Sequence, residues 1–379
     1  MSFFKNFKFK IKSNYPNLVR FLIKIRDNNY FLRILKKPIF ISATKKVHGK
    51  KIVKSERGVL FDLSFDNYVS YTFRPKKSKN SDFSEEVFDN SSTAIIIQGP
   101  LYGLKNFVKE TLLFYTKIFE NVPVILSTWK DECKKEFLDE FDKYQNIKII
   151  RNEKPQSNYN VDFQTLSTNE ALNFAKSKNI SYCLKTRTDT RIYKKNSIFF
   201  LKNLLKSFPI EKKYSELKDR IISCSIDTRK YRVYGLSDIL LFSSTENLMK
   251  YFEKKDFSSS LREMGFEKYP CLKNDVAVIN EIFLCARFLK MNNIKIDWSL
   301  EDWWNKCREI FCVVDSNSLD FFWYKYEWNY EQRFNNNYTS SFEQSMQFSD
   351  WLNLYQNPNF IFKNKLKEKW QIKDGIIVQ

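Results

Sequence analysis

A regular alternation of short apolar runs and amphipathic stretches, which begins at Thr93, constrains the fold of this chain more than any other feature. Apolar runs predict buried strands, and apolar residues at three- and four-residue spacing predict helices that cover them. A repeated strand–helix order predicts a parallel, doubly wound sheet with right-handed crossovers. We expect strands at 94–98, 122–126, 147–150 and 182–184, and helices at 105–119, 128–144 and 167–178.

Two of these helices carry a signature for their first turn. Thr128 precedes Asp131, and Ser167 precedes Glu170, at the spacing of a capping box. We therefore expect the two helices to begin at Thr128 and Ser167. After Tyr193 the order is mixed, and we expect helices at 197–207, 245–252 and 275–291, strands at 221–225 and 239–242, and a helical and irregular region past Leu300.

The carboxyl ends of the four expected strands are polar. Parallel strands bring these ends to one edge of the sheet, where ligands of such folds bind. This edge is therefore the expected functional site. Its residues are Gln98-Gly99-Pro100, Ser127-Thr128-Trp129, Arg151-Asn152-Glu153 and Arg187-Thr188-Asp189.

The last of these ends suggests the chemistry. Cys183, Lys185, Arg187, Asp189 and Arg191 share parity, so a continuous strand would project them to one face. Asp189 could hold Mg²⁺ or Mn²⁺ that bridges a diphosphate, because these ions need only one or two protein carboxylates beside phosphate oxygens. Lys185 and Arg187 could instead offset the charge of a leaving group directly. An internal Arg–Asp ion pair would also explain these residues.

Charge is concentrated at the N-terminus. The chain has 64 Lys and Arg against 44 Asp and Glu, a formal charge of +20, and residues 1–46 carry twelve of the cations with Asp27 as their one acid. Such a field favours anionic partners. Apolar residues within 17–37 recur at nearly helical spacing. This stretch is either a basic amphipathic helix on an anionic membrane surface or a helix packed on the protein with solvated lysines.

Several classes of function have no support in the sequence. With 7 glycines the chain contains neither a G-x-G-x-x-G nor a P-loop motif. Its 7 cysteines are scattered and His48 is its one histidine, which argues against a zinc site of the usual spacing and suits a reducing compartment. We see no signal peptide and no apolar run of about 18 residues, the length of a membrane span. We expect a cytoplasmic protein, peripheral at the inner face of the membrane.

Four segments follow from these patterns. Residues 1–50 form the basic segment, and 51–92 a hairpin (51–73) with a polar linker (75–92). Residues 93–315 form the expected catalytic domain. Residues 316–379 form a C-terminal extension rich in Trp, Tyr, Phe and Asn.

The motifs resemble those of two known groups. Apolar residues followed by Lys185-Thr186-Arg187-Thr188-Asp189 resemble the metal-binding region of GT-A glycosyltransferases, where the usual form is Asp-x-Asp and Arg187 stands at the first Asp. The chain more closely resembles the WavE family of lipopolysaccharide-synthesis proteins. That likeness rests on 95–100, 125–129, Gln164 with Ser167-Thr168, 184–189 and, more weakly, 236–238.

The resemblance implies a GT-A-like α/β fold, a Rossmann-like parallel or mixed sheet flanked by helices, with N- and C-terminal additions. It also implies a nucleotide-sugar donor and a divalent cation (Mn²⁺ or Mg²⁺) at Asp189. Trp129 could stack on the base or merely cover the sheet end, and Gly99-Pro100 could equally form an ordinary turn. The donor-binding candidates are Gln98, Gly99, Pro100, Trp129, Gln164, Lys185, Arg187, Asp189 and Arg191.

Asp238 and Glu281 are the catalytic candidates. Asp238 could contact the sugar or act as a general base, or be a turn carboxylate. Glu281 is a candidate base for the acceptor hydroxyl if it faces the site, and a surface residue if it faces water.

Three functions remain open. The first is a glycosyltransferase that extends a bacterial surface glycan (lipopolysaccharide, lipooligosaccharide or capsule) on a glycan or lipid-linked acceptor. The second is a non-enzymatic protein that binds anionic membranes or nucleic acid; the localised charge argues against it, and we expect no nucleic acid partner. The third is a sugar nucleotidyltransferase, which usually opens with a glycine-rich loop that is missing here. The sequence leaves the oligomeric state open.

Overall fold

The computed structural model describes residues 44–47, 50–54, 60–62, 90, 92–157, 159–254, 280–324, 344–362, 371–373 and 376–378. The chain divides into two compact units, Met1–Lys76 and Lys77–Gln379. In the first unit, β1 (Thr44–Val47), β2 (Lys50–Lys54) and β3 (Leu60–Asp62) form an antiparallel sheet in that order. Of the hairpin expected at 51–73, residues 51–54 and 60–62 belong to β2 and β3, and the remainder lies outside the described residues. The basic helix expected at 17–37 lies outside the described residues, and so does nearly all of the linker.

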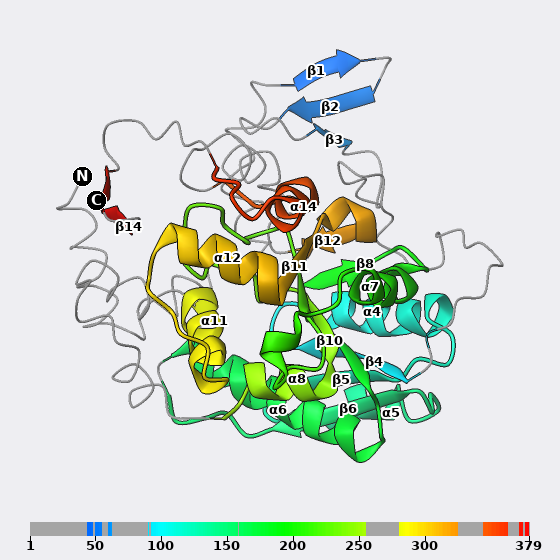
Figure 1. Ribbon diagram of the computed structural model, residues 1–379. Coiled ribbons are helices and arrows are strands. Elements are labelled where there is room, and N and C mark those ends of the chain that lie inside the picture. The colour runs from blue at the N-terminus through cyan, green and yellow to red at the C-terminus, as the bar shows by residue number, and fades with distance from the viewer. Residues whose placement is uncertain are drawn as a thin grey trace. The chain divides into compact units, whose positions relative to one another are not determined.

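The second unit is built on a seven-stranded sheet in the order β11-β9-β10-β7-β4-β5-β6 (Figure 1). Every strand of this sheet runs in one direction except β10, which pairs antiparallel with β7 and β9. The expected α/β class with a mostly parallel sheet is confirmed. The strands are β4 (Thr93–Gln98), β5 (Val124–Trp129), β6 (Ile147–Asn152), β7 (Tyr182–Arg187), β9 (Ile221–Cys224), β10 (Leu241–Ser244) and β11 (Phe311–Val314).

Helices cover both faces of this sheet. α6 (Asn160–Ser177) packs on β4 and β5 and against α8 (Thr245–Tyr251) and α11 (Asn280–Met291), which Figure 1 shows on its side of the sheet. The chain runs outward from β4 to β6 and returns to β7, so right-handed crossovers place α4 (Lys105–Ile118) on the opposite face. In the part of the chain that the structure describes, the other helices of at least five residues are α5 (Lys135–Asp139), α7 (Ser197–Ser207), α12 (Leu300–Ile310) and α14 (Phe348–Gln356).

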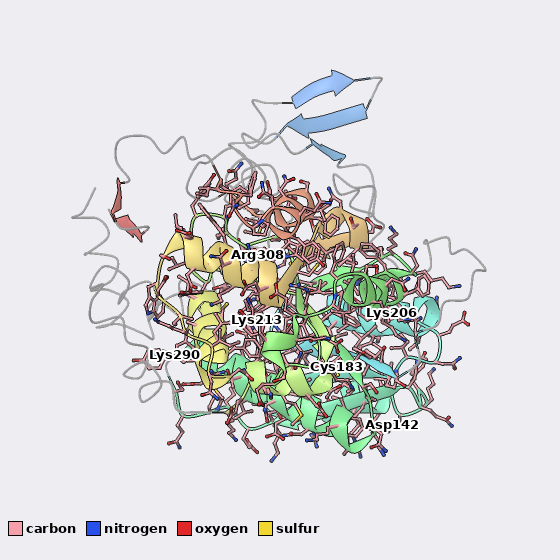
Figure 2. The ribbon with its side chains drawn as sticks, in the orientation of Figure 1. Asp142, Cys183, Lys206, Lys213, Lys290 and Arg308 are labelled. Carbon is pink, nitrogen blue, oxygen red and sulfur yellow. The ribbon has the colours of Figure 1, made fainter. Side chains whose placement is uncertain are left out.

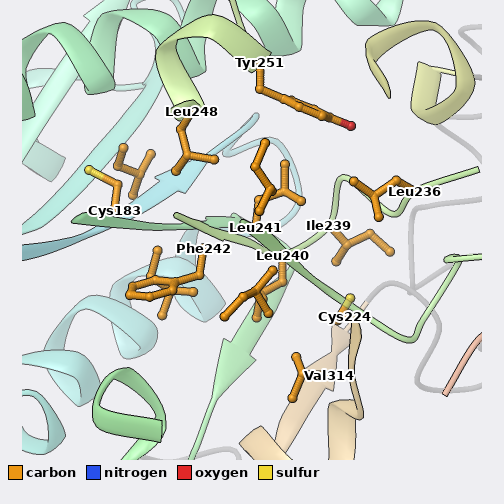
Figure 3. Packing of buried hydrophobic residues seen from close by; sticks show 14 of the residues in the cluster. Cys183, Cys224, Leu236, Ile239, Leu240, Leu241, Phe242, Leu248, Tyr251 and Val314 are labelled. Atoms are coloured by element: carbon orange, nitrogen blue, oxygen red, sulfur yellow. The ribbon is translucent and has the colours of Figure 1, made fainter. Parts of the chain in front are cut away.

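The central strands are buried on both faces, as continuous apolar runs in a covered parallel sheet require. Figure 3 shows the consequence at β10, where Leu241 faces Leu248 and Tyr251 of α8 while Phe242 packs on the other side. Charged side chains such as Lys206 and Lys290 lie at the outside of the unit (Figure 2). Among the described residues, the cysteines are buried free thiols, and no helix has the length and apolarity needed to cross a membrane.

Both helix starts predicted from capping boxes are wrong. Thr128 is a buried residue of β5, and α5 begins only at Lys135. Ser167 lies in the middle of α6, which already begins at Asn160, and its Oγ donates to the Phe163 carbonyl oxygen at 2.7 Å. In both places packing against the sheet overrides the local signature.

Several strands after β7 were not predicted. β8 (Thr190–Ile192) pairs antiparallel with β12 (Phe321–Trp323) in a small second sheet, and β11 joins the edge of the main sheet beside β9. A further hairpin joins β13 (Gln371–Lys373) and β14 (Ile376–Val378).

Candidate functional site

The site lies where the chain changes its direction of travel across the sheet, between β4 and β7. Gln98 and Arg187 end these strands as register partners. The Thr188 N–H donates to the Gln98 carbonyl oxygen at 3.0 Å, so the two strand ends remain joined beyond the ladder. A position of this kind is a topological switch point, where open α/β sheets bind ligands at the carboxyl ends of their strands.

Gly99 allows the two strand ends to meet. Its φ is +137°, and a Cβ at this position would lie 2.6 Å from Thr188 Oγ1. Its N–H donates to the Ser127 carbonyl oxygen at 3.1 Å, which joins the turn to β5 as well. Glycine is thus required both by conformation and by space. Pro100, the next residue, is exposed.

Arg187 and Asp189 form a bidentate ion pair at the end of β7. Arg187 Nε lies 2.9 Å from Asp189 Oδ1, and Nη2 lies 3.0 Å from Oδ2. Trp323 of β12 donates its indole N–H to Oδ2 at 2.9 Å, and its ring lies 5.5 Å from the guanidinium carbon. The Arg187 side chain remains 30% exposed, whereas that of Asp189 is 6% exposed. The ion pair is therefore rigid, and it presents its cation, rather than its carboxylate, to solvent.

These residues do not fit the divalent cation expected at Asp189. Both carboxylate oxygens of Asp189 already accept hydrogen bonds from Arg187 and Trp323. Nor does any group of three or more His, Cys, Asp or Glu in the described part of the chain form a metal-binding cluster. The Arg187 guanidinium stands where the charge of a cation would act.

Lys185 is a buried lysine that supports a neighbouring loop. Its side chain is fully buried, and Nζ donates to the main-chain carbonyl oxygen of Asp238 at 2.5 Å. Burial lowers its pKa to about 8, against the opposing effect of Asp238. The prediction that Lys185 contacts the donor directly is not supported by this position, because the ammonium is directed at the Asp238 backbone.

Asp238 and Glu281 both come close to Arg187. Leu241 of β10 pairs with Lys185, and β10 is antiparallel to β7, so Asp238 lies beyond the carboxyl end of β7. Glu281, in the first described turn of α11, is partly exposed. Burial and the neighbouring Asp238 raise its pKa to about 7, while Arg187 acts to lower it. Two carboxyl groups and one guanidinium, remote in sequence, thus share one electrostatic environment.

Several buried polar atoms of α6, α8 and the Asp238 loop have no hydrogen-bond partner among the described residues. They are Asp238 Oδ1 and Tyr251 Oη beside the carboxyl pair, and Gln164 Nε2, Thr165 Oγ1 and Thr168 Oγ1 on α6. A buried polar group without a partner costs about 1–3 kcal/mol. Asp238 and Tyr251 lie in the same electrostatic environment as Glu281, so a polar ligand bound there could satisfy both atoms.

Two predicted donor contacts occupy other positions. Arg191 is a correction: it donates from Nε to Thr111 Oγ1 at 2.9 Å and from Nη2 to the Phe107 carbonyl oxygen at 2.9 Å, so it fastens α4 to β8. The sequence analysis expected one continuous strand that projects Arg191 to the same face as Lys185 and Arg187. A turn at 188–189 ends β7 instead, so Arg191 belongs to another strand. Trp129 is 3% exposed and packs edge-on against Phe163, so its ring covers the sheet end.

Sequence reasoning missed Trp323 and Tyr251. Trp323 lies 134 residues from the carboxylate it binds, and no local pattern marks it. Tyr251 closes an amphipathic helix, where an aromatic residue signals only core packing. Neither could have been found without the fold.

No family model and no curated protein matches this chain. Among solved structures, one similar chain is described as a "Putative Glucose-1-Phosphate Thymidylyltransferase from Bacillus anthracis", in complex with a sucrose. It shares 7% identity and a TM-score of 0.30, over 54% of this chain and 97% of that chain. A likeness this slight says nothing of what this chain does, and the function has to be inferred from the site itself.

Proposed function

We propose that this protein is a GT-A-like glycosyltransferase, related to the WavE family, that moves a sugar from a nucleotide-sugar donor to a bacterial surface glycan. The observation that carries the proposal is the meeting of Arg187, Asp238 and Glu281 at the switch point between β4 and β7. The mixed seven-stranded sheet flanked by helices is compatible with a fold of this class.

Arg187 is the group that would receive the donor's phosphates. A guanidinium has five N–H donors, and the pair with Asp189 uses two of them. The remaining donors belong to a partly exposed cation that Asp189 and Trp323 hold in one orientation. A fixed guanidinium suits phosphate oxygens and offsets the negative charge that grows on a departing nucleotide. The residues thus supply the charge without a step through a metal ion.

Glu281 is the group that would act as the base. A base works best when its pKa lies near the working pH, and burial beside Asp238 brings that of Glu281 to about 7. In the proposed reaction the acceptor oxygen forms a bond to the anomeric carbon as the bond from that carbon to the phosphate oxygen breaks. The acceptor proton passes to Glu281, and the electron pair leaves with the nucleotide beside Arg187.

The polar strand ends would bind the remainder of the donor. Gln98 and Gly99 lie at the switch point itself, and Gln164 presents a buried Nε2 without a partner among the described residues. Amide groups of this kind can read a nucleobase edge or a ribose. The acceptor is a glycan or a lipid-linked glycan, and residues 1–46 would keep the enzyme at an anionic membrane surface.

Nucleotide release measures the proposed reaction without a known acceptor, because water can take the acceptor's place. The wild type is incubated with UDP-, GDP-, dTDP- and CMP-sugars, beside Glu281→Gln and the exposed control Glu246→Gln. We expect release from at least one donor, a loss of about 10²–10⁴-fold in Glu281→Gln, and no change in the control. Equal rates in both variants would show that Glu281 is not the base.

A further inference from the structure

Tyr251 is a buried tyrosine at the end of α8, close to the proposed base. Its side chain is fully buried at the end of α8, yet Oη has no hydrogen-bond partner among the described residues. Figure 3 shows its ring beside Leu248, with the hydroxyl directed to the side on which Leu236 and Ile239 lie. Those two residues flank Asp238 in the sequence. The hydroxyl is therefore turned toward the loop that carries the second orphaned atom, Asp238 Oδ1.

The neighbouring contacts fix both groups in place. Lys185 Nζ holds the Asp238 backbone and lies 5.4 Å from the ring centre of Phe252, the residue after Tyr251. Arg287 of α11 donates to the Tyr251 carbonyl oxygen at 3.2 Å. The Asp238 loop, the end of α8 and α11 are thus tied together around this point, and the two side chains have little freedom to find other partners.

The two orphaned atoms have complementary chemistry. Burial raises the pKa of Tyr251 well above its usual value, and Asp238 and Glu281 act in the same direction, so the phenol keeps its proton and can donate it. A carboxylate oxygen of Asp238 can only accept. Tyr251 and Asp238 do not bond to each other, and a group that accepts from the first while it donates to the second would satisfy both.

We infer that Tyr251 and Asp238 form a hydroxyl-binding subsite for the sugar of the donor. An alcohol oxygen accepts and donates through a single atom, so one hydroxyl of the sugar could satisfy both side chains at once. The subsite lies beside Glu281 and Arg187, the proposed base and phosphate-binding groups, where the transferred sugar would stand between them. This inference rests on the proposed function and adds the residues that recognise the sugar.

The experiment compares paired ligands by titration calorimetry: UDP-glucose with UDP, GDP-mannose with GDP, and dTDP-glucose with dTDP. The variants are Tyr251→Phe and Asp238→Asn, which keep the shape of each side chain. The control is Tyr115→Phe, which removes the hydroxyl of another fully buried tyrosine, one that accepts from the Ile192 N–H on the far face of the sheet. We expect each site variant to lower the affinity for the nucleotide sugar by about tenfold and to leave the affinity for the matching nucleotide unchanged.

The outcomes separate the inference from the proposed function. The subsite is overturned if Tyr251→Phe lowers the affinities for nucleotide sugar and nucleotide equally. It is also overturned if the variant lowers neither affinity. A fall in the melting temperature of the free protein with no sugar-selective loss also overturns it, because that is the behaviour of a phenol bridged by a structural water. If the wild type binds no member of any pair, the proposed function itself fails.

Discussion

The Arg187 guanidinium donates to both carboxylate oxygens of Asp189, from Nε to Oδ1 at 2.9 Å and from Nη2 to Oδ2 at 3.0 Å. This pair occupies the position at which a GT-A-like enzyme would be expected to bind its metal. We therefore predict that donor binding and nucleotide release survive exhaustive chelation with EDTA. A loss of activity that added Mn²⁺ or Mg²⁺ restores would contradict the assignment of charge stabilisation to Arg187.

Asp189→Asn distinguishes a positioning carboxylate from a metal ligand. The amide oxygen can still accept from Arg187 or Trp323, but the charge that balances the buried part of Arg187 is lost. Removal of one partner of such a pair costs about 3–5 kcal/mol when it is buried, and less here because the Arg187 side chain is 30% exposed. We expect a lower midpoint of urea unfolding with nucleotide binding retained. Abolished binding in a variant that unfolds like the wild type would contradict this role.

The pH dependence of nucleotide release should follow Glu281. Its carboxyl pKa is raised to about 7, and the base acts as the carboxylate, so the rate should rise with pH through about 7 and reach a plateau above it. Glu281→Gln should have a flat profile at a low rate. A rate in the wild type that is constant from pH 5 to pH 8 would exclude Glu281 as the titrating base.

The same shift predicts a change in stability. Folding raises the Glu281 pKa from 4.5 to about 7, so the native state binds the proton more tightly, and stability falls as the pH rises through this window. Glu281→Gln removes that cost. We expect the variant to match the wild type near pH 4 and to be more stable by about 3 kcal/mol at pH 8, measured by urea unfolding. A variant less stable than the wild type at pH 8 would show that the ionised group is better accommodated than its pKa indicates.

Gly99 offers a test of the strand-end junction. Gly99→Ala places a Cβ 2.6 Å from Thr188 Oγ1 at a φ of +137°, and we expect it to cost about 1–3 kcal/mol and to weaken nucleotide binding. The matched control is Gly103→Ala, at a φ of +71° with no atom within 4 Å of the added Cβ. The double variant Gly99→Ala with Thr188→Ala should recover part of the loss. Equal costs at the two glycines would refute the close approach.

The basic N-terminus is expected to bind anionic lipid. In the full chain, four basic residues of the expected helix are changed to glutamate. Each cation contributes about 1 kcal/mol to binding of an anionic surface, so we expect the affinity for phosphatidylserine vesicles to fall by at least about 100-fold. A set of exposed lysines changed in the second unit controls for net charge. The first set is Arg20, Lys24, Arg26 and Arg33, and the control set is Lys134, Lys135, Lys206 and Lys212. Equal release by both sets would indicate attraction by overall charge instead of a membrane-binding helix.

Those parts of the fold that depend on local patterns could be predicted from the sequence. A buried parallel strand is a continuous apolar run, which is why β4 was found, and α7 was predicted at its observed bounds. The polar edge followed from the rule that parallel strands share their carboxyl ends. Asp238 and Glu281 could be proposed as catalytic candidates, because Asp238 precedes an expected strand and Glu281 lies in an expected helix. Only the fold brings them close to Arg187.

The remainder depends on contacts between distant segments. Ser167 and Glu170 have the spacing of a helix start, yet α6 runs through them because its preceding turns pack on the sheet. The two-residue turn after Arg187 moved Arg191 to another face, and no pattern in Lys185–Arg191 announces it. The Trp323 indole that fixes Asp189 comes from β12, which becomes a strand only when it pairs with β8.

A thermal-shift panel of UDP-, GDP-, dTDP- and CMP-sugars on the wild type and Arg187→Met, with the exposed Lys206→Met as control, tests the central claim most directly. At a donor concentration of 100 times Kd, a ligand stabilises the native state by about 2.7 kcal/mol, which raises the melting temperature by several degrees. We predict such a shift with at least one donor, its loss in Arg187→Met and its retention in the control. No shift with any donor, together with salt-sensitive binding to oligonucleotides, would contradict the claim.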